Sequence, residues 1–450
     1  MRPQPLTDLN DVTETPMFQP SERAARLLVA MENFLEDHVY PAEATLLNDH
    51  VALDAQRPRS QLMEALKARA RELGLWNLFL PHEEERHEPM SNLDYAFLAE
   101  LSGRSPFIAP EAMNCSAPDT GNMELLAMFG TPEQKRRWLR PLLDGEIRSA
   151  YVMTEPAVAS SDASNIATTI VRDGDDWVIN GRKWWISGVR REQCELLIVL
   201  GVTGDADDRH QRHSMVLIPR DTAGVEILRD LTVLGYNPVD SHVEIDFRDV
   251  RVPAEYILGD VGAGFAMSQA RLGPGRIHHC MRMVGMAERA LELMIDRAQS
   301  REAFGGPLAD QGVIREWIAD SRIEIDQTRL YTMYAAHLMD TVGNKAAASQ
   351  ISGIKVAAPA MVARVVDRAV QVYGAAGLSQ DTPLARLWAE TRVLRLADGP
   401  DEVHRRAVAR TELRRFDAAV TPVAKGAMAH LEHVRTARQR TAPSLTATSA

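Results

Sequence analysis

The sequence predicts a mainly helical protein with a central β domain, because two periodicities occupy separate parts of the chain. In residues 21–148 and again in 257–420, apolar residues recur at spacings of three and four, which is typical of amphipathic helices. In residues 149–256 the pattern changes to two-residue alternation between turns rich in Gly and Asp. The expected order is therefore helical, β and helical, and a length of 450 residues suits two or three domains.

The two ends of the chain are expected to lie outside these domains. Residues 1–20 contain four prolines, which interrupt helices, so we expect an extended arm. Residues 421–450 are rich in Ala, Thr and Ser, and we expect a frayed tail.

Capping residues mark the expected helices of the N-terminal domain. Ser21 is a suitable N-cap for the first helix, and Gly74 suits the end of a second at about 60–73. A third helix is expected at about 92–102. Further along, the run Thr131-Pro132-Glu133-Gln134 combines an N-cap, a proline at the first helical position and a Gln that can complete a capping box.

The β domain is expected to begin with two short hairpins. Residues 173–176, Asp-Gly-Asp-Asp, separate the first two strands, and Asn180-Gly181 is a type I′ hairpin signal. Trp184 and Trp185 are neighbours, so they are expected on opposite faces of the following strand. One indole can then be buried while the other meets a planar ligand.

Composition limits the classes of function. The net charge of −11 argues against nucleic acid as a partner, because binding a phosphate backbone needs a basic face. A local cluster of Arg and Lys can still bind a small anionic ligand. No apolar run approaches the roughly 20 residues of a membrane span, and the N-terminus has no apolar signal core. Cys115, Cys194 and Cys280 are scattered without metal-ligand spacing, so we expect a reducing, cytoplasmic setting and no metal site.

Two linked motifs in the middle segment carry a family resemblance. Residues 151–161 read YVMTEPAVASS, and residues 180–188 read NGRKWWISG. The pair resembles the signature of the acyl-CoA dehydrogenases, Y-x-[VM]-T-E-P-x-x-x-S-[SD] followed by N-G-x-K-x-W-I-[ST]-[GN]. The resemblance implies an N-terminal helical domain, a middle antiparallel β-barrel or sandwich and a C-terminal four-helix bundle. It also implies FAD as cofactor and an acyl-CoA thioester as substrate.

Two later motifs resemble elements with which the family binds FAD across a subunit boundary. Residues 301–305 read REAFG and are followed by Gln311, as in R-x-x-F-G…Q, and residues 371–377 read QVYGAAG, as in Q-x-[FY]-G-G-x-G. In the family the Arg and Gln hold the pyrophosphate and adenosine end of a neighbouring subunit's FAD, and an Arg fork matches paired phosphate oxygens. Ala375 stands where the family has a second Gly. The resemblance therefore implies a homodimer or homotetramer.

The chemistry is assigned to residues 397–404, which read ADGPDEVH. This run resembles the branch that includes animal members ten and eleven of the family, in which Asp replaces the usual Glu as base, so Asp398 is the expected base. Other branches carry the base on an earlier helix, at the positions of residues 273–276, which hold no carboxylate here. Arg276 matches an Arg near the CoA and the mouth of the cleft. No role is assigned to His278 and His279.

The resemblance implies a reaction in which Asp398 takes the α-proton of the thioester and flavin N5 takes the β-hydride, giving a trans-2-enoyl-CoA. The thioester carbonyl would accept hydrogen bonds from the backbone N–H of the base and from a ribityl hydroxyl. Burial is expected to raise the pKa of the Asp398 carboxyl from about 3.9, provided that no cation is adjacent. Electrons are expected to pass to an electron-transferring flavoprotein.

The resemblance assigns the following residues to the cofactor: Tyr151, Met153, Thr154, Ser160, Ser161, Trp185, Ile186, Ser187, Arg301, Phe304, Gln311, Gln371, Gly374, Ala375, Pro400 and Glu402. It assigns Ser161, Arg276 and Gly399 to the substrate.

Other readings of the same residues stay open. An acyl-CoA oxidase or a nitroalkane-oxidase-like enzyme would use the same fold and pass electrons to oxygen. A flavin monooxygenase of this fold usually lacks a base, which Asp398 argues against. A helical scaffold without enzymatic activity would purify without a flavin absorbance band.

Overall fold

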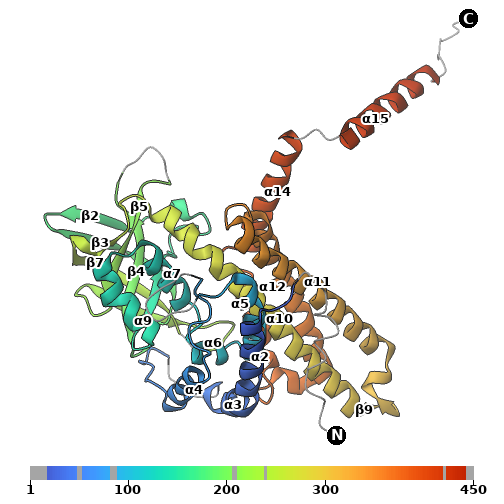
Figure 1. Ribbon diagram of the computed structural model, residues 1–450, viewed down its shortest axis with the longest axis horizontal. Helices are drawn as coiled ribbons and strands as arrows, with labels where there is room; N and C mark the ends of the chain where they lie inside the picture. Colours follow the sequence, from blue (N-terminus) through green and yellow to red (C-terminus); the bar gives the residue numbers. More distant parts are fainter. Residues whose placement is uncertain are drawn as a thin grey trace, which may run out of the picture.

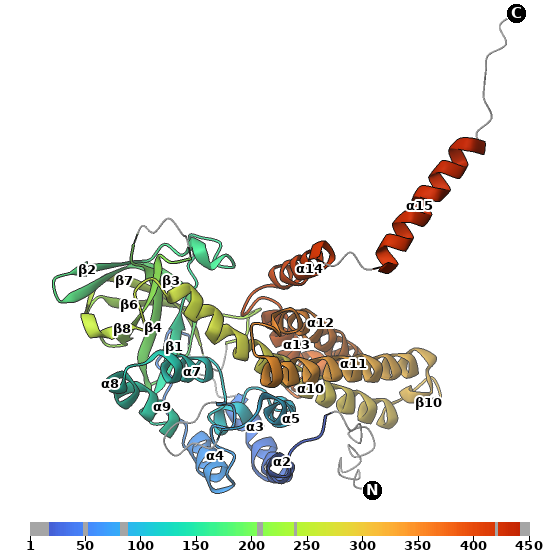
Figure 2. The same ribbon diagram turned by 45° about the horizontal axis from the view of Figure 1, so that its top comes forward.

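The structure is a computed structural model of the chain. It describes residues 18–47, 53–81, 89–204, 210–237, 241–418 and 422–441, so most of the expected N-terminal arm lies outside the described residues. Figures 1 and 2 show a β domain on one side, the C-terminal helices on the other, and the N-terminal helices packed beneath both. No helix in the described part of the chain is long and apolar enough to cross a membrane.

The N-terminal segment is helical, as predicted. Its helices are α2 (Glu22–Phe34), α3 (Tyr40–Leu47), α4 (Gln61–Glu72), α5 (Asn92–Gly103), α6 (Ala109–Ala112), α7 (Asp119–Phe129), α8 (Pro132–Gln134) and α9 (Arg140–Asp144). The predicted caps are confirmed, because the side chain of Ser21 accepts the N–H of Ala24 and Thr131 forms a complete capping box with Gln134.

The middle segment forms one sheet of eight strands. They are β1 (Arg148–Val152), β2 (Thr169–Asp173), β3 (Asp176–Ser187), β4 (Cys194–Val202), β5 (His213–Pro219), β6 (Val225–Leu231), β7 (His242–Pro253) and β8 (Ile257–Leu258). Their order is β6-β7-β3-β2-β4-β5-β8, with β1 beside β4. The sheet is not wholly antiparallel, because β1 and β2 both pair with β4 in parallel.

The predicted hairpin at Asn180-Gly181 is wrong. Residues 176–187 form one continuous strand, and β3 pairs with β7 on both sides of this dipeptide with a register shift at it. The Asn180 side chain exchanges two hydrogen bonds with Asp249 of β7, at 3.0 and 2.8 Å. Partners across the sheet therefore override the local turn preference of Asn-Gly. The predicted turn at 173–176 does form, between β2 and β3.

The C-terminal segment returns to helices. They are α10 (Gly264–Ser300), α11 (Gly312–Val342), α12 (Ala348–Tyr373), α13 (Leu384–Leu394), α14 (Asp401–Ala418) and α15 (Pro422–Thr441), with a small hairpin of β9 (Glu302–Ala303) and β10 (Gly306–Pro307) after α10. The frayed tail expected after residue 421 is wrong for residues 422–441, which form α15. Figures 1 and 2 show α14 and α15 extending away from the bundle.

Helix α10 connects the parts of the molecule. It has 37 residues and runs from the β domain to the far end of the bundle, packing against α5, α7, α11 and α12. Its contact with α5 is backbone to backbone, because a Cβ at Gly285 would collide with the carbonyl oxygen of Glu100. Such close contact fixes where along α10 every other side chain lies.

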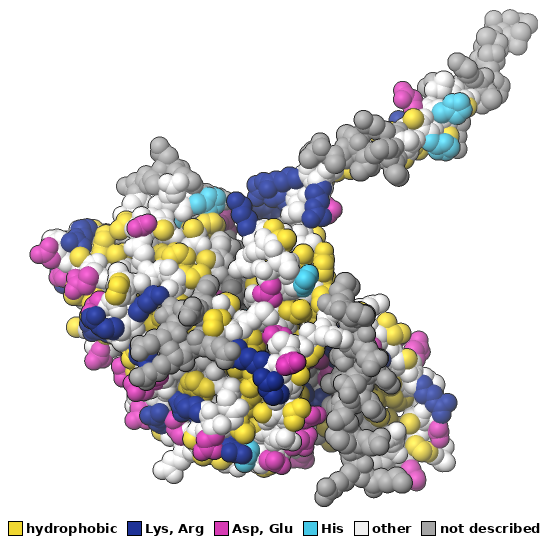
Figure 3. All heavy atoms as spheres, in the orientation of Figure 1, with side chains coloured by type: hydrophobic (Ala, Val, Ile, Leu, Met, Phe, Trp, Pro, Cys, Tyr) yellow, Lys and Arg dark blue, Asp and Glu magenta, His cyan; other side chains and the backbone are white. Residues whose placement is uncertain are grey.

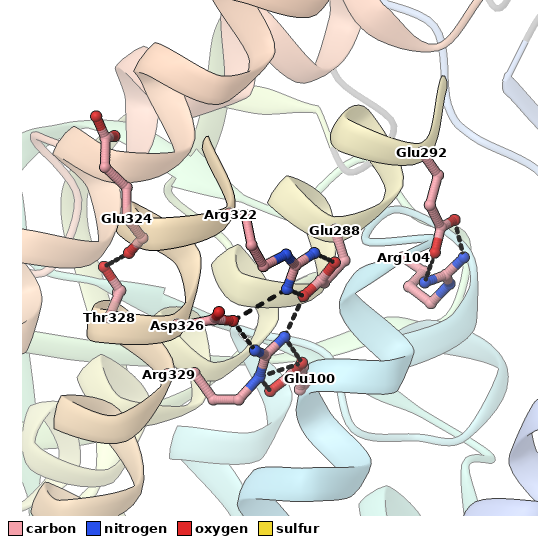
Figure 4. Close-up of polar contacts among 9 residues, drawn as sticks. All are labelled: Glu100, Arg104, Glu288, Glu292, Arg322, Glu324, Asp326, Thr328 and Arg329. Atoms are coloured by element: carbon pink, nitrogen blue, oxygen red, sulfur yellow. Dashed lines mark hydrogen bonds and ion pairs between the residues drawn. The ribbon is translucent and has the colours of Figure 1, made fainter. Parts of the chain in front are cut away.

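A buried charge network joins α5, α10 and α11 (Figure 4). Arg329 is 9 % exposed and donates to Glu100 at 2.8 Å, to Asp326 at 2.8 Å and to Glu288. Arg322 donates to Glu288 at 2.5 Å. Burial alone would raise the pKa of the Glu288 carboxyl, but the hydrogen bonds and charges of the two arginines lower it.

We expect Arg329→Met to lower the free energy of unfolding by about 3–5 kcal/mol, because it leaves Glu100 buried without its cation and removes one of the two arginines that pair with Glu288. Urea unfolding followed by circular dichroism measures this change. Arg415→Met is the matched control, because Arg415 and its partner Glu412 are both more than half exposed, and it should change stability by at most about 1 kcal/mol. Equal stability of the two variants would contradict the structural importance of the network.

Candidate active site

Asp398 lies in the turn between α13 and α14, in a backbone conformation that few residues adopt. Its φ is +55° and that of Gly399 is +102°. A Cβ at Gly399 would come within 2.9 Å of His404 Nε2, so only Gly fits there. A left-handed Asp outside regular structure is a strained position of the kind that gathers at functional sites.

Two side chains hold this turn by its backbone. Arg276 of α10 donates from Nε to the carbonyl oxygen of Asp398 at 3.1 Å, and His404 Nε2 lies 3.2 Å from the same oxygen. Arg276 was predicted to contact substrate, and in the structure it anchors the turn that carries Asp398. Just beyond, Asp401 accepts from Arg395 Nε at 2.8 Å, which ties the start of α14 to the end of α13.

The Asp398 carboxylate, 19 % exposed, is surrounded by groups that favour its charge. Burial would raise its pKa, but His279, Arg271, Lys355 and Arg276 lower it below its ordinary value. The expected rise in pKa is therefore wrong for the protein alone, because the condition that no cation is adjacent is not met. Asp398 is ionised at neutral pH.

Arg271, one of the cations that act on Asp398, also acts on Glu124 of α7. The Arg271 guanidinium lies 4.0 Å from the ring centroid of Tyr151 and donates to Asn122 Oδ1 at 3.0 Å. Glu124 of α7 is 1 % exposed, and neither of its carboxyl oxygens has a hydrogen-bond partner in the part of the chain that the structure describes. Burial raises the pKa of Glu124 to about 8, with Arg271 opposing the rise, so the group is mostly protonated at neutral pH.

A buried ion pair fastens the 151–161 motif onto the sheet. Lys183 is fully buried in β3, and its Nζ donates to Glu155 Oε1 at 2.9 Å, to the Met153 carbonyl at 2.8 Å and to the Leu200 carbonyl at 2.7 Å. The backbone N–H of Trp184 donates to the Thr154 carbonyl at 2.9 Å. The two halves of the sequence motif are thus one structural unit.

The end of β3 presents an indole to solvent. Trp185 is 42 % exposed with φ +56°, where a bulge between Lys183 and Ile186 interrupts the pairing with β7. Trp184 is only partly buried and Trp185 is exposed. The prediction that one indole is buried while the other faces a ligand is therefore wrong for the buried one. Ser187 Oγ lies 2.9 Å from His242 Nδ1. An exposed indole beside a hydroxyl, on a strained bulge, fits the edge and face of a planar ring such as flavin.

The remaining residues of this part of the predicted cofactor set lie in different surroundings. Ile186 is 1 % exposed and packs in the β core, so its side chain is not available to a ligand. Ser160 accepts the Glu155 N–H at 2.9 Å and shapes the loop, whereas Ser161 is exposed. Pro400 is half-buried beside Asp398, and the Glu402 side chain is 79 % exposed.

The other predicted cofactor residues lie at the far end of the bundle. Arg301 follows the last residue of α10, and Phe304 is 98 % exposed with φ +55°. Gln311 caps α11, while Gln371, Gly374 and Ala375 lie at the end of α12, whose Tyr373 is 5.5 Å from the Arg297 guanidinium. At 1.5 Å per residue, Arg301 lies about 35–40 Å along α10 from Arg276. One chain therefore presents two separated groups of predicted cofactor residues.

Three residues that act on Asp398 have no role in the sequence analysis: Arg271, His279 and Lys355. Each is a polar residue on a helix face that packs inward. The signal was helical spacing, because residues 271, 275, 276 and 279 share one face of a helix. That spacing alone does not say that the face meets a turn more than 100 residues later.

The chain belongs to the acyl-CoA dehydrogenase family, a class of flavin-dependent enzymes. Family models of its N-terminal, middle and C-terminal domains match residues 21–146, 150–250 and 262–413. These matches confirm the resemblance predicted from the motifs, and with it the fold class. Members of this family are enzymes that bind FAD.

Three relatives illustrate the match. "Probable acyl-CoA dehydrogenase FadE2" of Mycobacterium tuberculosis is 55% identical over 410 residues, covering 90% of this chain and all of the relative. Human acyl-CoA dehydrogenase family member 11 is 50% identical over 404 residues, covering 88% of this chain and 51% of the longer human protein. The solved "Structure of a putative acyl-CoA dehydrogenase from Mycobacterium abscessus" has a TM-score of 0.84 at 49% identity, covering 89% of this chain and 100% of that one.

We expect Glu124→Gln to stabilise the protein increasingly as pH rises from about 4.5 to 8. The folded pKa of about 8 lies above the ordinary value of 4.5, so the stability linked to the Glu124 proton is complete below pH 4.5 and is lost as pH rises through 8. Each pKa unit between the folded and unfolded states corresponds to about 1.4 kcal/mol, so the gain in the free energy of unfolding should reach a few kcal/mol. Urea unfolding at pH 5 and pH 8 measures it, with the exposed Glu72→Gln as control. A gain that is the same at both pH values would show that Glu124 is already ionised in the folded state.

Proposed function

We propose that Asp398 is the base that removes the α-proton of a bound acyl-CoA. The observation that supports this most is the placement of one ionised, mostly buried carboxylate in a strained turn, held by Arg276 and His404 through its backbone alone. Its Oδ2 faces His279 Nε2 at 3.5 Å, too far for a strong hydrogen bond, so the carboxylate can still meet a substrate. A Cβ at Gly275, in the stretch where other branches carry the base, would lie 3.8 Å from Asp398 Oδ2. A carboxylate at either of the two positions that the resemblance implies would thus lie at nearly the same point, which supports the proposal.

The surrounding residues would prepare Asp398 for proton removal. The cations keep it ionised before substrate binds, and an acyl chain that displaces water would raise its proton affinity through desolvation. The backbone N–H of Asp398 would donate to the thioester carbonyl and hold the charge that develops there.

The residues fit FAD, and when bound it supplies the hydride acceptor of the reaction. Tyr151, Thr154, Trp185 and Ser187 would hold the ring system near Asp398, since Tyr151 stacks on Arg271 and the 151–161 loop is fixed to β3. Figure 3 shows Arg and Lys side chains gathered near α14. That helix carries three exposed arginines soon after Asp398, namely Arg405, Arg406 and Arg410. They favour an anionic ligand such as CoA at this end of an otherwise acidic protein.

The functional unit would be a homodimer or homotetramer. Arg301, Phe304 and Gln311 are too far along α10 to reach the ring system held in their own chain, and they are at least partly exposed. A second copy that places this group against the first site would complete it. We also propose an electron-transferring flavoprotein as the electron acceptor, and the acyl chain length stays open.

We expect Asp398→Asn to retain fold and bound flavin but to lower the rate of flavin reduction by several orders of magnitude, because the amide cannot accept the proton. Anaerobic bleaching of the flavin by a panel of acyl-CoA thioesters measures the rate and identifies the preferred chain. Glu412→Gln, on the exposed face of α14, is the control and should reduce flavin at the wild-type rate. Bleaching of the Asn variant at the wild-type rate would place the base elsewhere.

We expect Arg301→Ala to lose FAD or to weaken assembly, because it removes a charged fork from the far group. Flavin content after dilution and light scattering measure both effects. Arg69→Ala on α4 is the control, since Arg69 is 44 % exposed and pairs only with the exposed Glu72 among the described residues. Unchanged flavin content and mass for Arg301→Ala would contradict its role.

A further inference from the structure

One side chain faces the reactive carboxylate directly, and the reaction as proposed does not use it. His279 Nε2 of α10 lies 3.5 Å from Asp398 Oδ2. His279 is one helical turn after Gly275 and Arg276, so all three lie on the face of α10 that meets the turn. The His279 side chain is 23 % exposed and lies inside the site.

The other histidines nearby have different partners. His404 meets the backbone carbonyl of Asp398, not its carboxylate. His278 points to aromatic rings, with its ring centroid 4.7 Å from that of Tyr95 and 6.4 Å from that of Phe79. Among the described residues, His279 alone combines a titratable nitrogen with direct access to the Asp398 carboxylate.

The charges around His279 leave it neutral before the reaction. Burial lowers the pKa of its imidazole to about 4, the Asp398 carboxylate opposes that change, and Arg282, Lys355 and Arg271 lower the pKa further. These groups come from α10, α12 and the 398 turn, and His404 of α14 has a pKa of about 4 as well. A neutral imidazole has one nitrogen free to accept a proton.

The separation of 3.5 Å is longer than an ordinary N···O hydrogen bond of about 2.7–3.2 Å. The resting pair is therefore not strongly hydrogen-bonded, and in the tautomer that carries its proton on Nδ1 the neutral ring turns the lone pair of Nε2 toward Asp398. A proton on Asp398 would provide the missing donor between the two atoms.

We propose that His279 is a positioning residue and the second proton acceptor of the reaction, taking from Asp398 the proton that Asp398 removes from substrate. The proposal rests on Asp398 being the base. The α C–H bond breaks, its electron pair stays on the substrate as the enolate, and the proton forms an O–H bond on Asp398. The proton then moves from Oδ2 to Nε2, which restores the carboxylate beside an imidazolium. No further oxidant or co-reactant is needed for this transfer.

The cations around Asp398 explain why a transfer of the proton to His279 is favourable. They lower the pKa of the Asp398 carboxyl, which makes it a weak holder of a proton. Before the transfer, the protonated Asp398 and the neutral His279 carry no charge. After it, a carboxylate faces an imidazolium, and the Asp398 carboxylate stabilises that charged form of the ring.

The test separates proton removal from hydride transfer in the FAD-loaded oligomer. A 3-thia-acyl-CoA has sulfur in place of the β-carbon, so it has an α-proton but no hydride to give at that position. Exchange of its α-protons with D2O, followed by proton NMR, therefore measures the base alone. We expect His279→Gln to slow exchange by about 10- to 100-fold. We expect the control His278→Gln, on the same helix but facing Tyr95, to stay within about threefold of wild type.

The pH profile distinguishes proton transfer from a merely structural role. Among the groups that lower the pKa of the Asp398 carboxyl, His279 has the largest effect, so its removal should raise that pKa. The fall of the exchange rate at acidic pH should therefore begin at a higher pH in the variant. The proposal would be overturned if His279→Gln exchanged more slowly but kept the pH profile of the wild type. It would also be overturned if His279→Gln exchanged at the wild-type rate. Exchange that persists in Asp398→Asn would instead contradict the assignment of the base.

A second measurement needs no change at His279. In 15N-histidine holoenzyme, the ring signal of His279, assigned from its loss in His279→Gln or His279→Asn, should titrate near pH 4. Asp398→Asn should shift this titration to lower pH, because the carboxylate favours the imidazolium. An unchanged titration would overturn the coupling of the two groups.

Discussion

The position of α10 is the constraint on which the rest of the structure depends. One face of this helix brings Arg271, Arg276 and His279 to Asp398, and later turns place Glu288 in the buried charge network. Backbone contact at Gly285 leaves no room for α10 to slide against α5. Because successive residues on a helix are 100° apart, a slip of one residue would turn every one of these side chains away from its partner.

The charges around Asp398 serve two opposing needs. A base must be ionised before substrate arrives, which nearby cations favour, and it must also hold a proton afterwards, which they oppose. Burial and the approach of an acyl chain raise the proton affinity of Asp398, and the proposed transfer to His279 would then take the proton from it. Glu124 shows the other extreme in the same region, since its carboxyl has one cation nearby and no hydrogen bond among the described residues, and burial dominates.

The sequence predicted most of the architecture but only part of the site. Period and capping residues located helices well, as at Ser21 and Thr131, because these signals are local. The hairpin predicted at Asn180-Gly181 was wrong, because pairing of β3 with β7, which is distant in sequence, outweighed the local turn preference of this dipeptide. Motifs assigned roles to Asp398 and Trp185, and those roles stay predictions. The cations that lower the Asp398 pKa come from α10 and α12 and become its neighbours only on folding. The composition of residues 421–450, rich in Ala, Thr and Ser, did not predict the helix at 422–441, because composition carries no information on helical spacing.

Isotope effects on the anaerobic reduction of bound flavin test the central claim most directly. Acyl-CoA labelled with deuterium at C2 reports proton removal, and label at C3 reports hydride transfer. If Asp398 removes the α-proton as the chain's residues indicate, C2 deuteration should slow flavin reduction several-fold in wild type, and the acidic limb of that slowed step should follow the titration of the Asp398–His279 pair. Reduction that is insensitive to C2 label while remaining sensitive to C3 label, at every pH tested, would contradict proton removal by this carboxylate as part of the rate-limiting chemistry.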